Sequence, residues 1–129
     1  MNMDTESKLI DLKNLGRIII GNYIICTYQD LNYVGLNIMQ IDGKSFIKLS
    51  YYTDKPNIGH LSSLCVPKEC RRQGRGRSTM EFAEMIARKM GMTELNGVLE
   101  NMDWRHDWYN RLGFKDNFHD STLVITKNL

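Results

Sequence analysis

Apolar and polar residues alternate over most of the first half of the chain, in short stretches rich in Ile, Val, Leu and Tyr. Such stretches, bounded by Gly, Asn, Asp and Pro, are typical of β-strands joined by tight turns. The pair Asp42-Gly43 between two of them strongly indicates a β-hairpin. The strands predicted in this half are Arg17–Ile20, Tyr23–Tyr28, Val34–Ile41, Lys44–Tyr52 and Ile58–Val66.

The spacing changes after Gly76, where apolar residues recur every three or four positions as far as Gly91. This period predicts an amphipathic helix, and a glycine suits its C-terminal end. The face predicted to pack on the core carries Phe82, Ala83, Ile86, Ala87 and Met90. The opposite face, predicted to lie in solvent, carries Arg77, Glu81, Glu84 and Arg88.

Two more helices and three more strands complete the predicted order. The helices are Leu9–Leu15, which ends at Gly16, and Asp103–Leu112, which begins with an Asp cap and ends at Gly113. The strands are Glu94–Leu99, one that starts at Phe114, and residues 121–127. Without repeats or linkers, residues 1–129 are predicted to form a single α/β domain of the α+β type. Its mixed, mostly antiparallel sheet is flanked by helices.

Composition agrees with a globular protein of about one domain, since 42% of the 129 residues are hydrophobic and 25% are charged. Cys26, Cys65 and Cys70 form no C-x-x-C pair, so reduced thiols in a cytoplasmic protein are expected, and no metal site. The N-terminus lacks the order of a signal peptide, and the longest apolar run is far shorter than the ~20 residues of a membrane span. No membrane segment is therefore predicted.

Positive charge is concentrated in one segment. Lys68–Arg77 holds five basic residues and one acidic residue, a local +4, whereas the whole chain carries only +2 and the remainder therefore −2. Binding of long nucleic acid more often spreads charge over a face. The segment instead lies between a predicted strand and a predicted helix start, where free amides and the glycines Gly74 and Gly76 suit a pyrophosphate. The chain has no Walker motif, and Thr79 stands where a dinucleotide fingerprint needs its third glycine.

Two motifs resemble the GNAT superfamily, the Gcn5-related N-acetyltransferases. The family signature [QR]-x-x-G-x-[GA] is matched in register by Arg71, Gly74 and Gly76, and the family's frequent lYeklGF is matched by "WYNRLGF", Trp108–Phe114. The helix, strand and helix between the motifs also follow the family order. The resemblance covers about Ile58 to Phe114, while the first 57 residues have only a compatible strand pattern.

The chain departs from the family pattern at three positions. The family commonly reads LxVxPxxRgkGiG where this chain reads LCVPKECRRQGRG, so Pro67 falls one place early. Arg105 replaces the usual small residue four before the Tyr. Asn101 lies eight residues before Tyr109, where family members often have an Asn seven before the Tyr. The last departure puts the expected cofactor contact of Asn101 in doubt.

The resemblance implies acetyl-CoA as cosubstrate, an amine as acceptor, and a sheet whose strands near Val66 and Glu94–Leu99 part to admit the pantetheine arm. The resemblance is compatible with a homodimer and does not decide the oligomeric state. The backbone of Leu64, Cys65 and Val66 would bind that arm, with the Leu64 N–H as donor to the thioester oxygen. The residues expected to hold the pyrophosphate are Arg71, Arg72, Gln73, Gly74, Arg75, Gly76 and Arg77.

The family motif implies Tyr109 as the general acid that protonates the leaving thiolate, although Tyr is also common as a buried aromatic. His60 matches the position of the general base in some members, although a strand histidine is more often a satisfied polar residue. Histidine in unstructured peptides titrates near pH 6.5, which suits proton removal. Water held near Ser62 and Ser63 is the other predicted base.

Three other functions stay open from the sequence. They are a GNAT-fold module that binds CoA without catalysis, a nucleic-acid-binding domain, which the charge distribution disfavours, and a transferase for longer acyl chains. The acceptor is not recognisable in the N-terminal strands.

Overall fold

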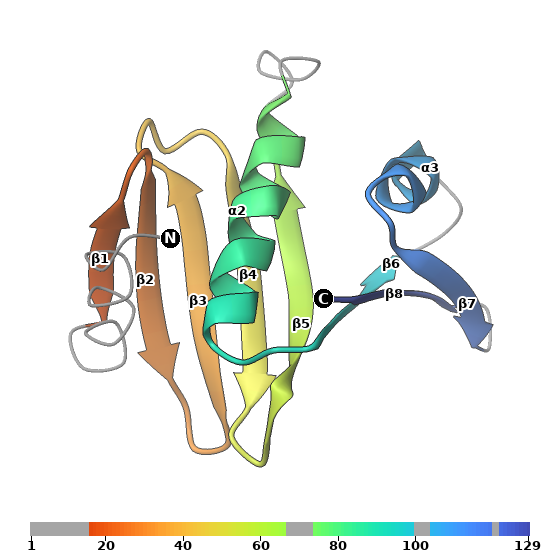
Figure 1. The fold of residues 1–129 in the computed structure, drawn as a ribbon, viewed down its shortest axis with the longest axis horizontal. Coiled ribbons are helices and arrows are strands. Elements are labelled where there is room, and N and C mark those ends of the chain that lie inside the picture. The colour runs from red at the N-terminus through yellow and green to blue at the C-terminus, as the bar shows by residue number, and fades with distance from the viewer. Residues whose placement is uncertain (1–15, 67–73, 100–103, 120–121) are drawn as a thin grey trace.

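One mixed sheet contains all the strands of the computed structural model, which describes residues 16–66, 74–99, 104–119 and 122–129 (Figure 1). Its eight strands lie in the order β1-β2-β3-β4-β5-β6-β8-β7. Neighbouring strands are antiparallel except for β5 and β6, which run parallel. The predicted fold class, a mostly antiparallel mixed sheet with helices, is therefore confirmed.

The element bounds are close to those predicted, and each predicted strand is present. The strands are β1 Arg17–Ile20, β2 Tyr23–Gln29, β3 Tyr33–Gln40, β4 Phe46–Tyr52, β5 Lys55–Cys65, β6 Glu94–Leu99, β7 Lys115–His119 and β8 Thr122–Asn128. The described helices are α2 Arg75–Lys89 and α3 Trp104–Arg111. The helix predicted over Leu9–Leu15, the cap Asp103 and the cysteine Cys70 lie outside the described residues.

Strand β5 starts at Lys55, three residues before the predicted Ile58. The register with β4 shifts between the pairs Ser50↔His60 and Tyr52↔Lys55. Pro56 lies in this irregular stretch, where its missing N–H costs no ladder hydrogen bond. Because proline is typical of turns, Pro56 was assigned to a turn, and the strand was predicted to start too late.

The predicted Asp42-Gly43 turn joins β3 to β4. Gly43 has φ 76°, and its N–H donates to the Gln40 carbonyl at 2.8 Å. The Asp42 side chain accepts a hydrogen bond from the Lys44 N–H at 2.9 Å. Each of these contacts holds the turn closed.

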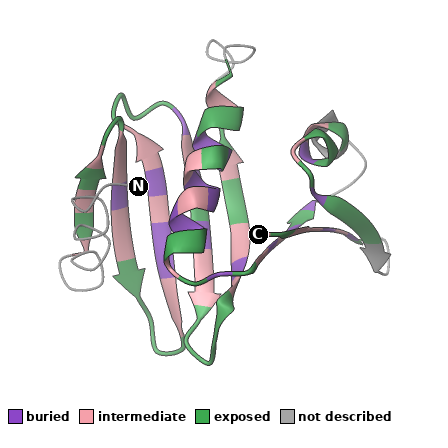
Figure 2. Ribbon diagram, viewed as in Figure 1, coloured by how far each residue is buried: buried purple, intermediate pink, exposed green. Residues whose placement is uncertain are grey.

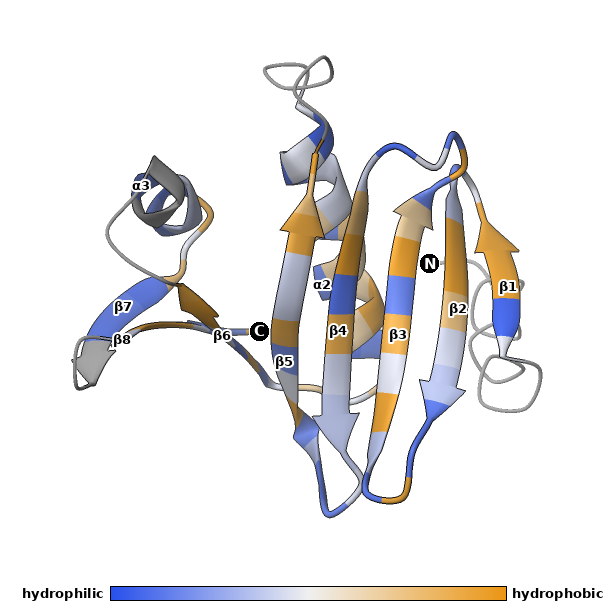
Figure 3. Ribbon diagram, turned by 180° about the vertical axis from the view of Figure 1, so that it is seen from behind, coloured by the Kyte–Doolittle hydropathy of each residue, from blue (hydrophilic) through white to orange (hydrophobic). Residues whose placement is uncertain are grey.

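Helix α2 covers β3, β4 and β5 on one face of the sheet, and the core lies between them (Figures 1 and 2). The predicted face is confirmed, since Ala83, Ile86 and Ala87 have no exposed surface. The buried apolar residues are Ile25, Leu36, Ile38, Ile47, Leu49, Met80, Ala83, Ile86, Ala87, Met92, Leu95, Leu99, Tyr109, Phe114, Leu123 and Ile125. The described helices leave the other face of β1–β5 uncovered (Figure 3).

Glu84 was predicted to lie in solvent. This prediction is wrong, because only 5% of the surface of Glu84 is exposed. Its carboxylate lies 2.6 Å from the ammonium of Lys127 on β8. Helical periodicity marks Glu84 as polar, but it carries no information about a lysine that approaches from a distant strand.

Candidate active site

The strands β5 and β6 pair over four residues only, from Ile58↔Glu94 to Leu61↔Gly97. Beyond Leu61, β5 continues to Cys65 and β6 continues to Leu99 without pairing to each other. The predicted parting of these strands is thus confirmed.

A β-bulge lies at the point of separation. Lys48 pairs with Ser63 and Leu49 pairs with Leu61, so Ser62 is the extra residue of β5. A bulge bends its strand and increases the local twist, which turns the end of β5 away from β6. Ser62 and Ser63 are both exposed there.

The predicted pantetheine contacts lie on this free end of β5 or directly after it. Leu64 is half-buried against the core, Cys65 is exposed as a free thiol, and Val66 follows the strand. On its other side the strand remains paired, with Ile47↔Leu64 and Phe46↔Cys65. The edge that faces the gap is therefore held rigid from behind by β4.

Helix α2 begins beside the end of β5, and its start differs from the prediction. Gly74 is the N-cap, in the left-handed conformation at φ 75°, so Arg75 and Gly76 belong to the first turn. No side chain caps this end, and the first turn has no acidic residue. Amides at a helix start, with the positive end of the dipole, attract an anion.

The structure describes only some of the other residues that were predicted to contact the cofactor. Arg77 is exposed on the first turn of α2. Arg71, Arg72, Gln73 and Asn101 lie outside the described residues, so their roles stay predictions.

Gly76 lies against an aromatic ring of α3. A Cβ atom at this position would lie 3.1 Å from Cζ2 of Trp108 and 3.4 Å from Cγ2 of Val66. A Cβ at Gly74, in contrast, would have no atom within 4 Å. Gly76 therefore allows α2, β5 and α3 to pack closely where the strands part.

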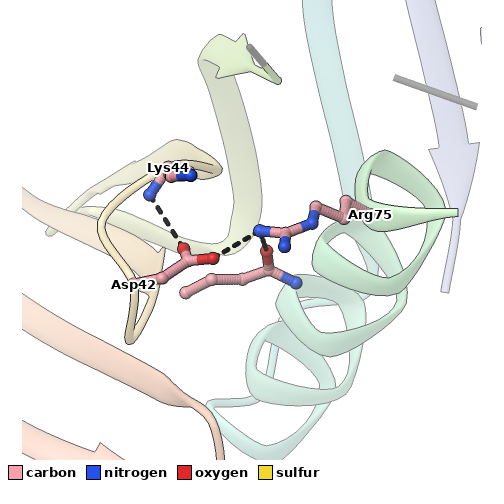
Figure 4. Close-up of polar contacts among 4 residues, drawn as sticks. Asp42, Lys44 and Arg75 are labelled. Carbon is pink, nitrogen blue, oxygen red and sulfur yellow. Dashed lines mark hydrogen bonds and ion pairs between the residues drawn. The ribbon is translucent and has the colours of Figure 1, made fainter. Parts of the chain in front are cut away.

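The side chain of Arg75 extends to the turn between β3 and β4 (Figure 4). Its Nη1 lies 2.5 Å from Oδ2 of Asp42 and 3.3 Å from Oε1 of Gln40. The hydrogen bond from Arg75, and then that from the Lys44 amide, lower the pKa of Asp42.

His60 lies on β5 one residue before the last β5–β6 pair, Leu61↔Gly97. Its Nδ1 is 2.6 Å from Oδ1 of its cross-strand partner Asn96, and Tyr52 packs edge-to-face on its ring at 5.4 Å between centroids. Because an amide oxygen only accepts hydrogen bonds, this contact assigns the proton of the neutral ring to Nδ1. Nε2 is then the nitrogen that can accept a proton.

Tyr109 is 6% exposed and lies on α3. Trp108 and Phe114 pack edge-to-face on its ring at centroid distances of 4.9 and 5.5 Å. The chain passes from α3 to β7 at Gly113, with φ 97°, and the Phe114 N–H donates to the Tyr109 carbonyl at 3.1 Å. The WYNRLGF motif is thus a helix end that fixes one aromatic ring.

Sequence reasoning missed Asn96 and Trp108 as site residues and took Asp42 only as a turn residue. Asn96 and Asp42 contact partners that are 36 and 33 positions away in the chain. No local pattern signals such contacts. Trp108 could have been found from the sequence, because it is the first residue of the WYNRLGF motif.

Two negative findings concern the described residues alone. Within them, no three His, Cys, Asp or Glu side chains come together as a metal site would require. None of the helices in the described ranges combines the length and the apolar character needed to span a membrane.

Solved structures with a similar fold include the PaiA N-acetyltransferase from Thermoplasma acidophilum in complex with coenzyme A (TM-score 0.64, 22% identity). That match covers 77% of this chain and 62% of the other, so this chain spans less than two thirds of that protein. The ribosomal-protein-S18-alanine N-acetyltransferase from Escherichia coli has TM-score 0.60 and 18% identity, over 78% and 71%. Nourseothricin acetyltransferase has TM-score 0.59 and 16% identity, over 98% and 95%.

At these identities the likeness concerns the fold alone, and the last two names indicate different acceptors. Curated protein sequences gave no significant match. The profile of one family, described as the acetyltransferase (GNAT) domain, matches residues 19–116 and thus most of the chain. The match includes β5, the start of α2 and the WYNRLGF motif, and the chain belongs to this GNAT acetyltransferase family.

Proposed function

We propose that the protein is an N-acetyltransferase that moves the acetyl group of acetyl-CoA directly to a primary amine. The observation that carries this proposal is the separation of β5 from β6 beside the start of α2, where no side chain caps the helix and the first turn has no acidic residue. An extended thioester arm and a pyrophosphate have complementary partners at these two places. Family membership supports the reaction class.

The cosubstrate is proposed to bind as an added strand on the free edge of β5. The backbone of Leu64, Cys65 and Val66 pairs with the pantetheine amides, and the Leu64 N–H donates to the thioester oxygen as it becomes negative. The amides of the first turn of α2 hold the pyrophosphate, together with Arg77 and the predicted residues of 71–73.

The acceptor must lose a proton before it attacks, because a lysine-like amine with a pKa of ~10.4 is protonated at pH 7. His60 is proposed to accept this proton at Nε2, either directly or through water near Ser62 and Ser63. The hydrogen bond to Asn96 supports this role, because it holds the ring and leaves Nε2 without a proton.

The neutral amine nitrogen then forms a bond to the acyl carbon, and the carbon–sulfur bond breaks. The electron pair of that bond leaves with the sulfur, and Tyr109 is proposed to donate a proton to the thiolate. The acylated nitrogen releases its second proton to water, and a proton from water restores the Tyr109 hydroxyl. The amide product and CoA thiol result without a metal or a covalent enzyme intermediate. The buried, well-packed ring supports a fixed position for the Tyr109 hydroxyl.

A thiol-release assay with acetyl-CoA tests the proposal, using polyamines, aminoglycosides, arylalkylamines, and lysine or N-terminal peptides as acceptors. Amine-dependent thiol release is the expected result. A shift of the melting temperature by CoA without release by any acceptor would instead indicate a binding module. Affinity for DNA without any for CoA would indicate nucleic-acid binding.

The acyl group is tested by comparing acetyl-CoA with longer acyl-CoA donors at equal concentration. The proposal expects the highest kcat/KM with acetyl-CoA. A preference for a longer chain would retain the transferase and change its donor.

A further inference from the structure

Arg75 belongs to the basic segment, but its guanidinium lies against the β3–β4 turn instead of projecting from the helix end (Figure 4). Of the two partners, Asp42 lies in this turn and Gln40 is the last residue of β3. The side chains of Arg75 and Asp42 are 29% and 37% exposed, so the pair is partly shielded from water. A phosphate bound by Arg75 would have to share the guanidinium with an existing carboxylate.

The Asp42 carboxylate is held in place by the turn itself, independently of Arg75. One oxygen of Asp42 accepts from the Lys44 N–H, and the other contacts Arg75. The Gln40 N–H donates to the Ser45 carbonyl at 2.8 Å, which closes the base of the turn. The first turn of α2 is therefore tied to a preformed part of the sheet.

Charge also explains the pairing. A basic side chain in the first turn of a helix opposes the helix dipole, and Asp42 neutralises this charge without capping the amides. Contact with Arg75 lowers the pKa of Asp42, so the carboxylate stays ionised throughout the pH range above its usual titration. The link is lost only as pH falls through this lowered pKa.

We propose that Asp42 and Arg75 are positioning residues, which fix the first turn of α2 so that its amides meet the pyrophosphate, and that Arg75 is not itself a phosphate ligand. The proposal rests on the proposed function, because it concerns the binding of acyl-CoA. It gives the β3–β4 turn, outside both family motifs, a role in cofactor affinity.

The two roles of Arg75 predict opposite signs for Asp42→Asn. Loss of an anchor weakens CoA binding, whereas release of a phosphate ligand from a competing carboxylate strengthens it. The substitution also removes one negative charge from the protein, which by itself favours binding of the anionic CoA. Weaker binding would therefore occur against the electrostatic trend.

The experiment measures CoA affinity by calorimetry for Asp42→Asn, Arg75→Gln and the double variant. We expect a rise of Kd of about three- to tenfold in each single variant, and no further rise in the double variant because both changes break one link. With acetyl-CoA as the varied substrate, KM should rise while kcat stays the same. Inhibition by pantetheine, which lacks the phosphates, should not change.

Asp54→Asn is the matched control, since Asp54 is exposed in the β4–β5 turn and makes no hydrogen bond or ion pair within the described ranges. It should leave Kd unchanged. Tighter CoA binding by Asp42→Asn, or a larger loss in the double variant than in either single variant, would overturn the anchor. Wild-type protein that binds no CoA would refute the proposed function, whereas normal binding by all variants would refute only the anchor. Titrations well below each melting temperature separate these results from unfolding.

Discussion

The two sides of the parted strands are built differently. On one side, β1 to β5 form a continuous antiparallel meander, and α2 packs across β3, β4 and β5. On the other side, β6, β7 and β8 form a smaller antiparallel unit that α3 contacts through β7. Within the sheet, four residue pairs between β5 and β6 join the two sides.

Side chains supply further links between the two sides. Lys127 of β8 reaches Glu84 of α2, and its ammonium also donates to the Leu112 carbonyl at the end of α3, again at 2.6 Å. Trp108 of α3 lies against Gly76 of α2. Because β5 and β6 do not pair beyond Leu61, these side-chain contacts help to hold the two sides in place around the gap.

The first side carries the proposed cofactor contacts, and the second supplies the proposed acid. Tyr109→Phe should therefore lower kcat by about 100- to 10,000-fold, the usual contribution of a general acid or base, with little change in CoA affinity. The ring and its packing are retained, so steady-state kinetics and calorimetry report on the hydroxyl.

Tyr23→Phe is the control for Tyr109→Phe, because Tyr23 stacks on Phe82 on the first side at a centroid distance of 4.0 Å. It should keep full activity. If Tyr109→Phe behaves in the same way, the thiolate takes its proton from water.

Lys127→Met removes the charged link between the two sides. Breaking a largely buried ion pair on one partner typically costs about 3–5 kcal/mol of unfolding free energy, because the other charge stays unpaired. Urea denaturation measures this loss, and Glu84→Gln in addition to Lys127→Met should recover part of it.

Lys115→Met is the control, since Lys115 is exposed on the neighbouring strand β7. It should change the free energy of unfolding by less than about 0.5 kcal/mol. An equally small effect of Lys127→Met would mean that packing alone connects the two sides.

Gly76→Ala tests the contact between α2 and α3. The added methyl group would lie 3.1 Å from Trp108, so we expect a loss of about 1–3 kcal/mol from overpacking and weaker CoA binding. Trp108→Phe removes the ring atom nearest to that methyl group and should partly restore CoA affinity in the double variant. Without such recovery, the glycine would be needed for the ligand and not for the tryptophan.

Asn96→Leu should have the smallest effect. Loss of one hydrogen bond of about 1 kcal/mol corresponds to about a fivefold fall in kcat, with the KM for acetyl-CoA unchanged. In His60→Gln, which should remove the acid limb of the pH–rate profile, the added Asn96→Leu should have no further effect. Additive losses would show that Asn96 acts independently of His60.

Much of the fold was predictable because local physics decides it. The period-2 stretches gave the strands, the Asp42-Gly43 pair gave the hairpin, and the change of period after Gly76 gave the helix. The start of β5 was missed because Pro56 reads as a turn residue and still fits an irregular strand. The burial of Glu84 was missed because its partner lies on β8.

The candidate site divides in the same way. The resemblance of the two motifs to the family implied the reaction class, and it implied roles for His60 and Tyr109 that stay predictions. Only the tertiary structure decided that His60 meets Asn96, that Arg75 meets Asp42 and that Trp108 meets Gly76. Each of these pairs joins elements that are brought together by sheet order and helix packing, and the energy of such a contact depends on distances in space that no local sequence pattern encodes.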